Sequence, residues 1–155
     1  MGSRMEIRRA EKKDLVKIHI LVIDTIHNVF PRYYPQGAVY SFLDHHRESE
    51  ILADIENQNA YVLEVDGVLV GTITIKENMI NRLFLLPGYQ GKGYGKNLLE
   101  YAENMIYKDH ETVRLETSLP AKLFYLKYGY KEVASDFIVV ANGDILFWDV
   151  MEKNK

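Results

Sequence analysis

The fold of this chain is decided by residues 83–97, which read LFLLPGYQGKGYGKN. This stretch joins the apolar end of a predicted strand to an amphipathic helix through a loop that contains Gly91, Gly93 and Gly95. Glycines let backbone N–H groups approach an anion closely, and a helix N-terminus adds free donors and the positive end of its dipole. The loop therefore predicts a site for a phosphate-bearing ligand, with an ordinary tight turn as the alternative.

The glycine spacing differs from that of the commoner nucleotide-binding loops. A P-loop needs Gly-Lys followed by Ser or Thr, whereas Lys96 is followed here by Asn97. The Rossmann fingerprint places its third glycine three positions after the second, whereas a single residue separates Gly93 from Gly95. Both nucleotide-binding folds are therefore disfavoured.

The rest of the chain alternates helical and strand patterns. Helices are predicted where apolar residues recur at three- and four-residue spacing, at residues 15–29, 39–46, 51–55, 98–106 and 121–128. Strands are predicted where β-branched and apolar residues concentrate, at residues 6–9, 61–65, 68–75, 80–86, 113–117, 137–141 and 145–150. Asp66-Gly67 and Asn142-Gly143 suit two-residue hairpin turns. This order predicts an α/β fold built on one mixed sheet.

Composition narrows the class of protein. A chain of 155 residues with 47% hydrophobic and 26% charged residues predicts one globular domain, over residues 5–151. Residues 1–4 precede a second methionine, Met5, and look like a cloning remnant. A net charge of -3 without a basic run argues against a nucleic-acid partner. No apolar run approaches the ~20 residues of a membrane span, and the absence of cysteine suits a reducing compartment, so we expect a cytoplasmic protein with no membrane partner.

Two motifs resemble those of a known family. The pattern Gln90, two residues, Gly93, one residue, Gly95 resembles the acetyl-CoA signature of the GCN5-related N-acetyltransferases (GNAT). Residues 121–130, AKLFYLKYGY, resemble the second signature of that family. The resemblance implies a single mixed, mostly antiparallel sheet of six or seven strands, flanked by helices and splayed between strands four and five. It implies a protein that transfers the acetyl group of acetyl-CoA directly to a primary amine, expected to be that of a small molecule. A noncatalytic CoA-binding sensor or interaction module on the same fold is the alternative.

The resemblance also assigns the donor site. In the family, pantetheine lies between strands four and five, where backbone N–H groups of Leu83, Phe84 and Leu85 would meet the thioester, with Leu85 nearest the acetyl oxygen. The loop would hold the diphosphate. The residues expected to bind acetyl-CoA are therefore Leu83, Phe84, Leu85, Gln90, Gly91, Lys92, Gly93, Tyr94, Gly95, Lys96, Ser118 and Tyr125.

Two residues are the candidates for catalysis. Tyr125 matches the usual general acid of the family, and a phenol of pKa about 10 would protonate a thiolate whose acid lies near 8.5 with a small uphill step. Its alternative is an aromatic core residue. Glu116 is the first candidate for a general base, with a solvated or ion-paired strand carboxylate as the alternative. Glu77 and Glu64 are weaker candidates, and relatives often begin strand four with Glu near the position where Met79 stands.

The remaining expectations concern capping, the acceptor and assembly. Ser118 would contact CoA or cap the helix that follows it. Tyr33 and Tyr34 lie in a proline-bounded break between helices, where they would line the acceptor pocket or pack as a connection. The five histidines form no ligand pattern, and His45 and His46 are adjacent, so no metal is expected. Exposed strand edges would allow a homodimer.

Overall fold

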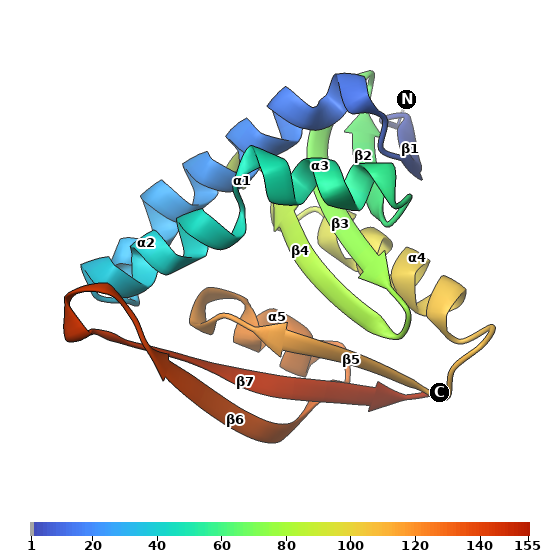
Figure 1. Ribbon diagram of the computed structural model, residues 1–155. Helices are drawn as coiled ribbons and strands as arrows, with labels where there is room; N and C mark the ends of the chain where they lie inside the picture. The colour runs from blue at the N-terminus through green and yellow to red at the C-terminus, as the bar shows by residue number, and fades with distance from the viewer. Residues whose placement is uncertain (1) are drawn as a thin grey trace.

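The computed structural model describes residues 2–155 and contains one seven-stranded sheet in the order β1-β2-β3-β4-β5-β7-β6 (Figure 1). The strands are β1 (Met5–Arg9), β2 (Ala60–Val65), β3 (Val68–Lys76), β4 (Met79–Leu85), β5 (Thr112–Thr117), β6 (Lys131–Val139) and β7 (Ile145–Asn154). The α-helices are α1 (Leu15–Val29), α2 (Gln36–His45), α3 (Glu48–Glu56), α4 (Tyr94–Ile106) and α5 (Lys122–Lys127). The predicted order of elements and the mixed, mostly antiparallel sheet are confirmed. In residues 2–155, no helix is long and apolar enough to span a bilayer.

Two hydrophobic cores lie on opposite faces of the sheet, because side chains alternate between faces along each strand. We call them the α1-side core and the α4-side core. The α1-side core is built from helices α1–α3 and the strand residues facing them, among them Val22, Ile26, Ile51, Val62 and Leu146. The α4-side core is built around α4, among them Ile80, Leu98, Leu99, Ile106 and Leu115. Figure 1 shows α1 and α3 in front of β2–β4, and α4 behind them.

The first hairpin follows its sequence signal. Val65 pairs with Val68 across Asp66 and Gly67, whose φ angles are 51° and 81°. Both residues therefore adopt the left-handed torsions that a tight two-residue turn requires. This turn fixes the register of β2 against β3, the strand that in turn pairs with β4.

The last hairpin was predicted with the wrong length. Val139 pairs with Ile145, so five residues, 140–144, connect β6 to β7 instead of the dipeptide Asn142-Gly143 alone. Asn142 and Gly143 do have positive φ, of 63° and 72°, but within a 3-10 turn (Ala141–Gly143). Strand β6 also begins earlier than predicted, at Lys131. The prediction missed its first half because that half mixes charged and small residues and lacks an alternating apolar pattern.

The sheet opens between β4 and β5, as predicted. These parallel strands pair only at Met79 with Arg114 and at Ile80 with Leu115, whereas β5 stays paired with β7 along all six of its residues. Figure 1 shows β4 diverging from β5 toward its C-terminal end. The second half of β4 therefore has an edge that no neighbouring strand covers.

A β-bulge distorts β4 at the start of this opening. Asn81 pairs with Thr74 and Phe84 pairs with Thr72, so Arg82 and Leu83 both oppose the single residue Ile73. The φ angle of Arg82 is 48°, in the left-handed region that non-glycine residues rarely adopt. The bulge is thus centred on a strained arginine.

Candidate functional site

The glycine loop presents unpaired backbone donors at the start of α4. Gly91 and Gly93 have φ angles of 75° and 88°, and Gly93 is the residue that precedes the helix. Within residues 2–155, no well-formed hydrogen bond takes up the backbone N–H groups of residues 91–96. Consecutive free N–H groups at the positive end of a helix dipole fit a diphosphate.

Two contacts hold the loop in place. The side-chain amide of Gln90 donates a hydrogen bond to the carbonyl oxygen of Leu85 at 3.0 Å, which ties the loop to the end of β4. A Cβ on Gly95 would meet two ring carbons of Phe124 at 3.1 and 3.3 Å. Gly95 therefore permits α4 to contact α5, and the two sequence motifs pack directly on each other.

The N–H group of Leu85 points into the opening between β4 and β5. Leu86 donates its N–H to the carbonyl of Val70 in β3 at 2.8 Å. Because successive N–H groups of a strand point to opposite sides, the N–H of Leu85 faces away from β3, where pairing with β5 has already ended. The residue predicted to lie nearest the acetyl oxygen thus carries a free donor in the gap.

Tyr125 lies on the α4 side of this opening. Its ring is buried in the α4-side core, against which Leu85 also packs. Among residues 2–155 no hydrogen-bond partner is found for its hydroxyl, and no fully buried side-chain oxygen or nitrogen lacks a partner, so the hydroxyl reaches solvent. Burial raises the pKa of Tyr125 above 10. The phenol is therefore a neutral donor, and proton transfer to a thiolate is more uphill than its ordinary pKa predicts.

Glu116 lies on the opposite face of the sheet. Leu115 and Thr117 are buried, whereas Glu116 is exposed and pairs with Val150 of β7. Trp148, two residues before Val150, packs against the α1-side core, so Glu116 shares that face. It makes no ion pair within residues 2–155.

The alternative carboxylates lie elsewhere. Glu64 accepts a hydrogen bond from Arg8 at 2.6 Å at the far edge of the sheet, and Glu77 lies in the turn between β3 and β4. Neither carboxylate is adjacent to the second half of β4. Of the acidic residues considered from the sequence, Glu116 alone lies on a strand that borders the opening.

The break between α1 and α2 approaches the end of β5. The hydroxyl of Tyr34 accepts a hydrogen bond from the N–H of Leu119 at 2.7 Å, and its buried ring lies 6.4 Å from that of Phe147. Tyr33 is half exposed on the surface of the same break. Ser118 precedes a 3-10 turn (Leu119–Ala121), but its hydroxyl makes no capping hydrogen bond. Ser118 therefore does not cap this turn through its side chain.

A cluster around Arg82 was not anticipated from the sequence. The guanidinium, 9% exposed, forms an ion pair with Asp54 of α3, and its Nε donates to Nδ1 of His46 at 2.9 Å. Burial, followed by the charge of Arg82, lowers the pKa of His46 from 6.5 to about 3, so the imidazole is neutral. His46 in turn lies edge-on to Phe84, at 5.5 Å between ring centroids. No sequence pattern marks an arginine as the centre of a bulge.

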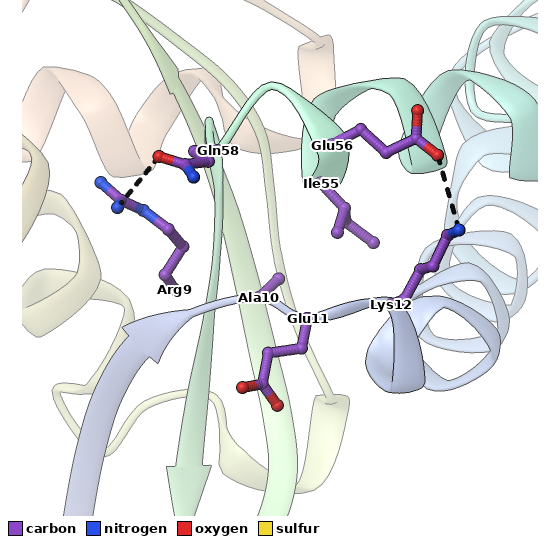
Figure 2. A pocket seen from close by; sticks show the side chains of 7 residues that line it. All are labelled: Arg9, Ala10, Glu11, Lys12, Ile55, Glu56 and Gln58. Atoms are coloured by element: carbon purple, nitrogen blue, oxygen red, sulfur yellow. Dashed lines mark hydrogen bonds and ion pairs between the residues drawn. The ribbon is translucent and has the colours of Figure 1, made fainter.

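A surface cavity lies away from these residues. It has a volume of about 600 Å³ and lies between the end of β1 and the end of α3 (Figure 2). Its lining includes an ion pair of Lys12 with Glu56 at 4.0 Å and a hydrogen bond from Arg9 to Gln58 at 3.4 Å. None of the predicted site residues lines it. Among residues 2–155, no group of three or more His, Asp or Glu side chains is arranged to hold a metal ion.

Comparisons with known proteins identify the family. The family model described as "Acetyltransferase (GNAT) domain" matches residues 29–144. The chain belongs to this family, and it is an acetyltransferase.

Solved structures and a curated relative extend the likeness. The GCN5-related N-acetyltransferase of Rhodopseudomonas palustris is 20% identical, with a TM-score of 0.87 over 100% of this chain and 99% of that one. The PaiA N-acetyltransferase of Thermoplasma acidophilum, solved with coenzyme A, is 24% identical, with a TM-score of 0.75 over 98% and 99%. The S-alkylcysteine N-acetyltransferase of Bacillus subtilis is 37% identical over 67 residues, which cover 36% of this chain and only 38% of that protein. The two structural likenesses show the shared fold.

Proposed function

We propose that this protein transfers the acetyl group of acetyl-CoA directly to the primary amine of a small molecule. The observation that carries the proposal is the free N–H of Leu85 in the sheet opening, next to a loop of unpaired N–H groups. Together these donors match a thioester and a diphosphate on one ligand. Membership of the GNAT family supports the same acetyl-CoA-dependent function.

On the donor side, each residue has a defined task. When bound, acetyl-CoA supplies the activated acyl group. The N–H groups of residues 91–96 bind the diphosphate, and the N–H of Leu85 donates to the carbonyl oxygen as negative charge develops there. Tyr125 donates its proton toward the departing sulfur. Solvation of the phenolate by the occupied site must offset the raised pKa of Tyr125.

On the acceptor side, the amine approaches from the opposite face of the sheet. Glu116 binds the ammonium and accepts a proton, directly or through water. Tyr33, half exposed in the break between α1 and α2, offers aromatic surface to the acceptor, while Tyr34 is buried behind it with its hydroxyl on the N–H of Leu119. The mild negative charge of the chain, -3, favours a cationic acceptor. The name of the Bacillus subtilis relative makes S-alkylcysteines the first small-molecule amines to assay.

The experiment is a thiol-release assay with acetyl-CoA and a panel of S-alkylcysteines, other amino acids, polyamines and N-terminal peptides. We expect turnover with one small-molecule class. Tyr125→Phe is expected to lower kcat about 100-fold, the range of a lost general acid. Its CoA affinity should stay within about threefold, because the loop that binds the diphosphate is untouched.

Tyr130→Phe is the matched control in the same motif. The hydroxyl of Tyr130 donates to Glu103 at 2.7 Å, so its loss should lower stability and leave kcat unchanged. Tight CoA binding without turnover of any amine would contradict the proposal and favour the noncatalytic sensor. Turnover restricted to peptides would contradict the small-molecule acceptor.

Two further properties complete the proposal. We infer that β6 pairs with β6 of a second copy, because all nine of its residues are exposed at the edge of the sheet. A second copy offers the same free N–H and C=O groups under twofold symmetry. We also propose a cytoplasmic location, since a chain without cysteine suits a reducing compartment.

A further inference from the structure

Strand β4 changes the direction of its backbone donors at the bulge. In β3, Ile75 donates its N–H to Asn59 on the β2 side at 2.8 Å, so the neighbouring residues Thr74 and Lys76 face β4. Their partners Asn81 and Met79 therefore direct their backbone groups toward β3. Before the bulge, the odd-numbered residues of β4 bond to β3.

After the bulge, the even-numbered residues bond to β3. Leu86 donates its N–H to Val70, and Phe84 pairs with Thr72. Without the extra residue the alternation would continue, and the N–H of Leu85 would be consumed by β3. The bulge is thus what turns the N–H of Leu85 into the opening.

Arg82 holds this bulge in place. Its φ of 48° places an L-residue in a strained conformation, which persists only where surrounding contacts determine it. Its guanidinium supplies those contacts through the ion pair with Asp54, the hydrogen bond to His46 and a hydrogen bond from Nη2 to the carbonyl of His45 at 3.4 Å. A further hydrogen bond reaches Thr74, the partner of Asn81 beside the bulge, at 3.5 Å. The partners come from α2, α3 and β3, so three elements fix one backbone torsion.

We propose that Arg82 is a positioning residue for acetyl transfer. Its side chain, clamped by Asp54 and His46, keeps the β4 bulge in register and thereby aims the N–H of Leu85 at the developing oxyanion. The proposal rests on the proposed function, in which Leu85 donates to the thioester carbonyl. Arg82 itself touches neither substrate.

Three variants test this role. Arg82→Ala removes the clamp, and the bulge is expected to relax so that kcat falls about 10- to 100-fold, somewhat less than the loss of an oxyanion donor. CoA affinity, measured by calorimetry, should change less than about threefold, because no hydrogen bond or ion pair of Arg82 reaches the diphosphate loop. Arg82→Gly accepts a positive φ without strain, so it should retain more kcat than Arg82→Ala despite lacking the same contacts.

Arg8→Ala is the control for lost stability. Arg8 is also an arginine held by two carboxylates, Asp14 and Glu64, but at the far edge of the sheet. Its variant should lose a comparable amount of thermal stability and keep its kcat. Equal loss of kcat in Arg8→Ala and Arg82→Ala would overturn the positioning role.

Amide hydrogen exchange at Leu85 gives a readout that does not need activity. The free N–H of Leu85 should exchange rapidly in the unliganded wild type and become protected in Arg82→Ala, where β3 takes it up. An unchanged Leu85 amide would overturn the inference. If the wild type acetylates no amine, the proposed function fails, while this exchange measurement still decides whether Arg82 sets the bulge. Should Arg82→Ala not fold, Asp54→Ala, which removes the ion pair of Arg82 from its other side, carries the same comparison.

Discussion

His46 ends α2 as a neutral imidazole, and its protonation is coupled to folding. Its Nδ1 accepts the Nε–H of Arg82, so a proton at that nitrogen would break the clamp and place two cations together. Burial lowers its pKa from 6.5 to about 3. The unfolded chain therefore binds this proton near pH 6.5 and the folded chain does not. The stabilising effect is complete above pH 6.5 and is lost as the pH falls toward 3.

Because the pKa of His46 is lower in the folded than in the unfolded chain, acid favours unfolding. We expect the free energy of unfolding of the wild type to drop by about 2 kcal/mol between pH 7 and pH 5 through His46 alone. His46→Gln keeps an acceptor for Arg82 but cannot titrate, so its stability should depend less on pH over that range. Urea unfolding at the two pH values measures the difference. Asp14 does not interfere, because Arg8 holds its pKa below 3.8, outside the window.

His27→Gln provides the comparison for this experiment, because His27 is exposed on α1. Its pH dependence should match that of the wild type. If His46→Gln and the wild type lose the same stability between pH 7 and pH 5, the imidazole of His46 is protonated in the folded protein and the assigned pKa direction is wrong.

At the scale of single residues, sequence reasoning identified groups with a motif and missed groups defined by packing. Gln90, Gly93 and Gly95 were singled out because their spacing resembles the acetyl-CoA signature of the family. Arg82 was missed because a positive φ in a strand depends on contacts with α2 and α3, which no local pattern encodes. Gly95 was expected only to let the backbone approach an anion. The structure shows a second reason for glycine, because a Cβ at this position would crowd the ring of Phe124.

The junction of the glycine loop with α4 is the element on which we expect donor binding to depend. Gly93 has a φ of 88°, and a Cβ there would meet no atom within 4 Å, so a substitution acts through torsion alone. Gly93→Ala should destabilise this backbone by about 1 kcal/mol or more. Relief of the strain would rotate the free N–H groups, so we expect CoA affinity to fall about tenfold, measured by calorimetry.

Gly88→Ala is the control in the same loop. A Cβ on Gly88 also meets no atom within 4 Å, and its φ is not positive. It should bind CoA as the wild type does. Equal CoA affinity in Gly93→Ala and Gly88→Ala would show that the torsion at the start of α4 does not control the diphosphate site.

Elements with strong periodicity were predicted well, and those whose ends depend on pairing were not. Helix α1 has the predicted bounds because its apolar stripe is continuous from Leu15 to Val29. The hairpin of β6 and β7 was placed by Asn142-Gly143, yet its true connection is residues 140–144, which pack against Gly37. The N–H of Gly37 donates to Asp144 at 2.8 Å, and a Cβ there would clash with the carbonyl of Ala141 at 2.0 Å. Gly37 and Asp144 are 107 positions apart in the sequence, so no local pattern predicts their contact.

On the scale of the whole molecule, the free edge of β6 is the feature that calls for a partner. Val133, Phe137 and Val139 are 51%, 60% and 67% exposed on this strand. Long apolar edge strands associate unless charge or a cover prevents it, so we expect this acetyltransferase to be a dimer. We expect light scattering after size exclusion to give twice the chain mass of 18.0 kDa.

The double variant Val133→Lys/Phe137→Lys should convert that dimer to a monomer, because charged side chains in place of two exposed apolar ones block pairing at a strand edge. Ile20→Lys, on a residue 52% exposed on α1, changes the same kind of surface and should remain dimeric. A wild type that stays at 18.0 kDa at about 100 μM, far above the ~1 μM dissociation constant of an ordinary weak dimer, would exclude pairing through β6. Since Tyr34 and Glu116, the residues proposed for the acceptor, belong to other elements, the monomeric variant should retain its kcat, which separates assembly from catalysis.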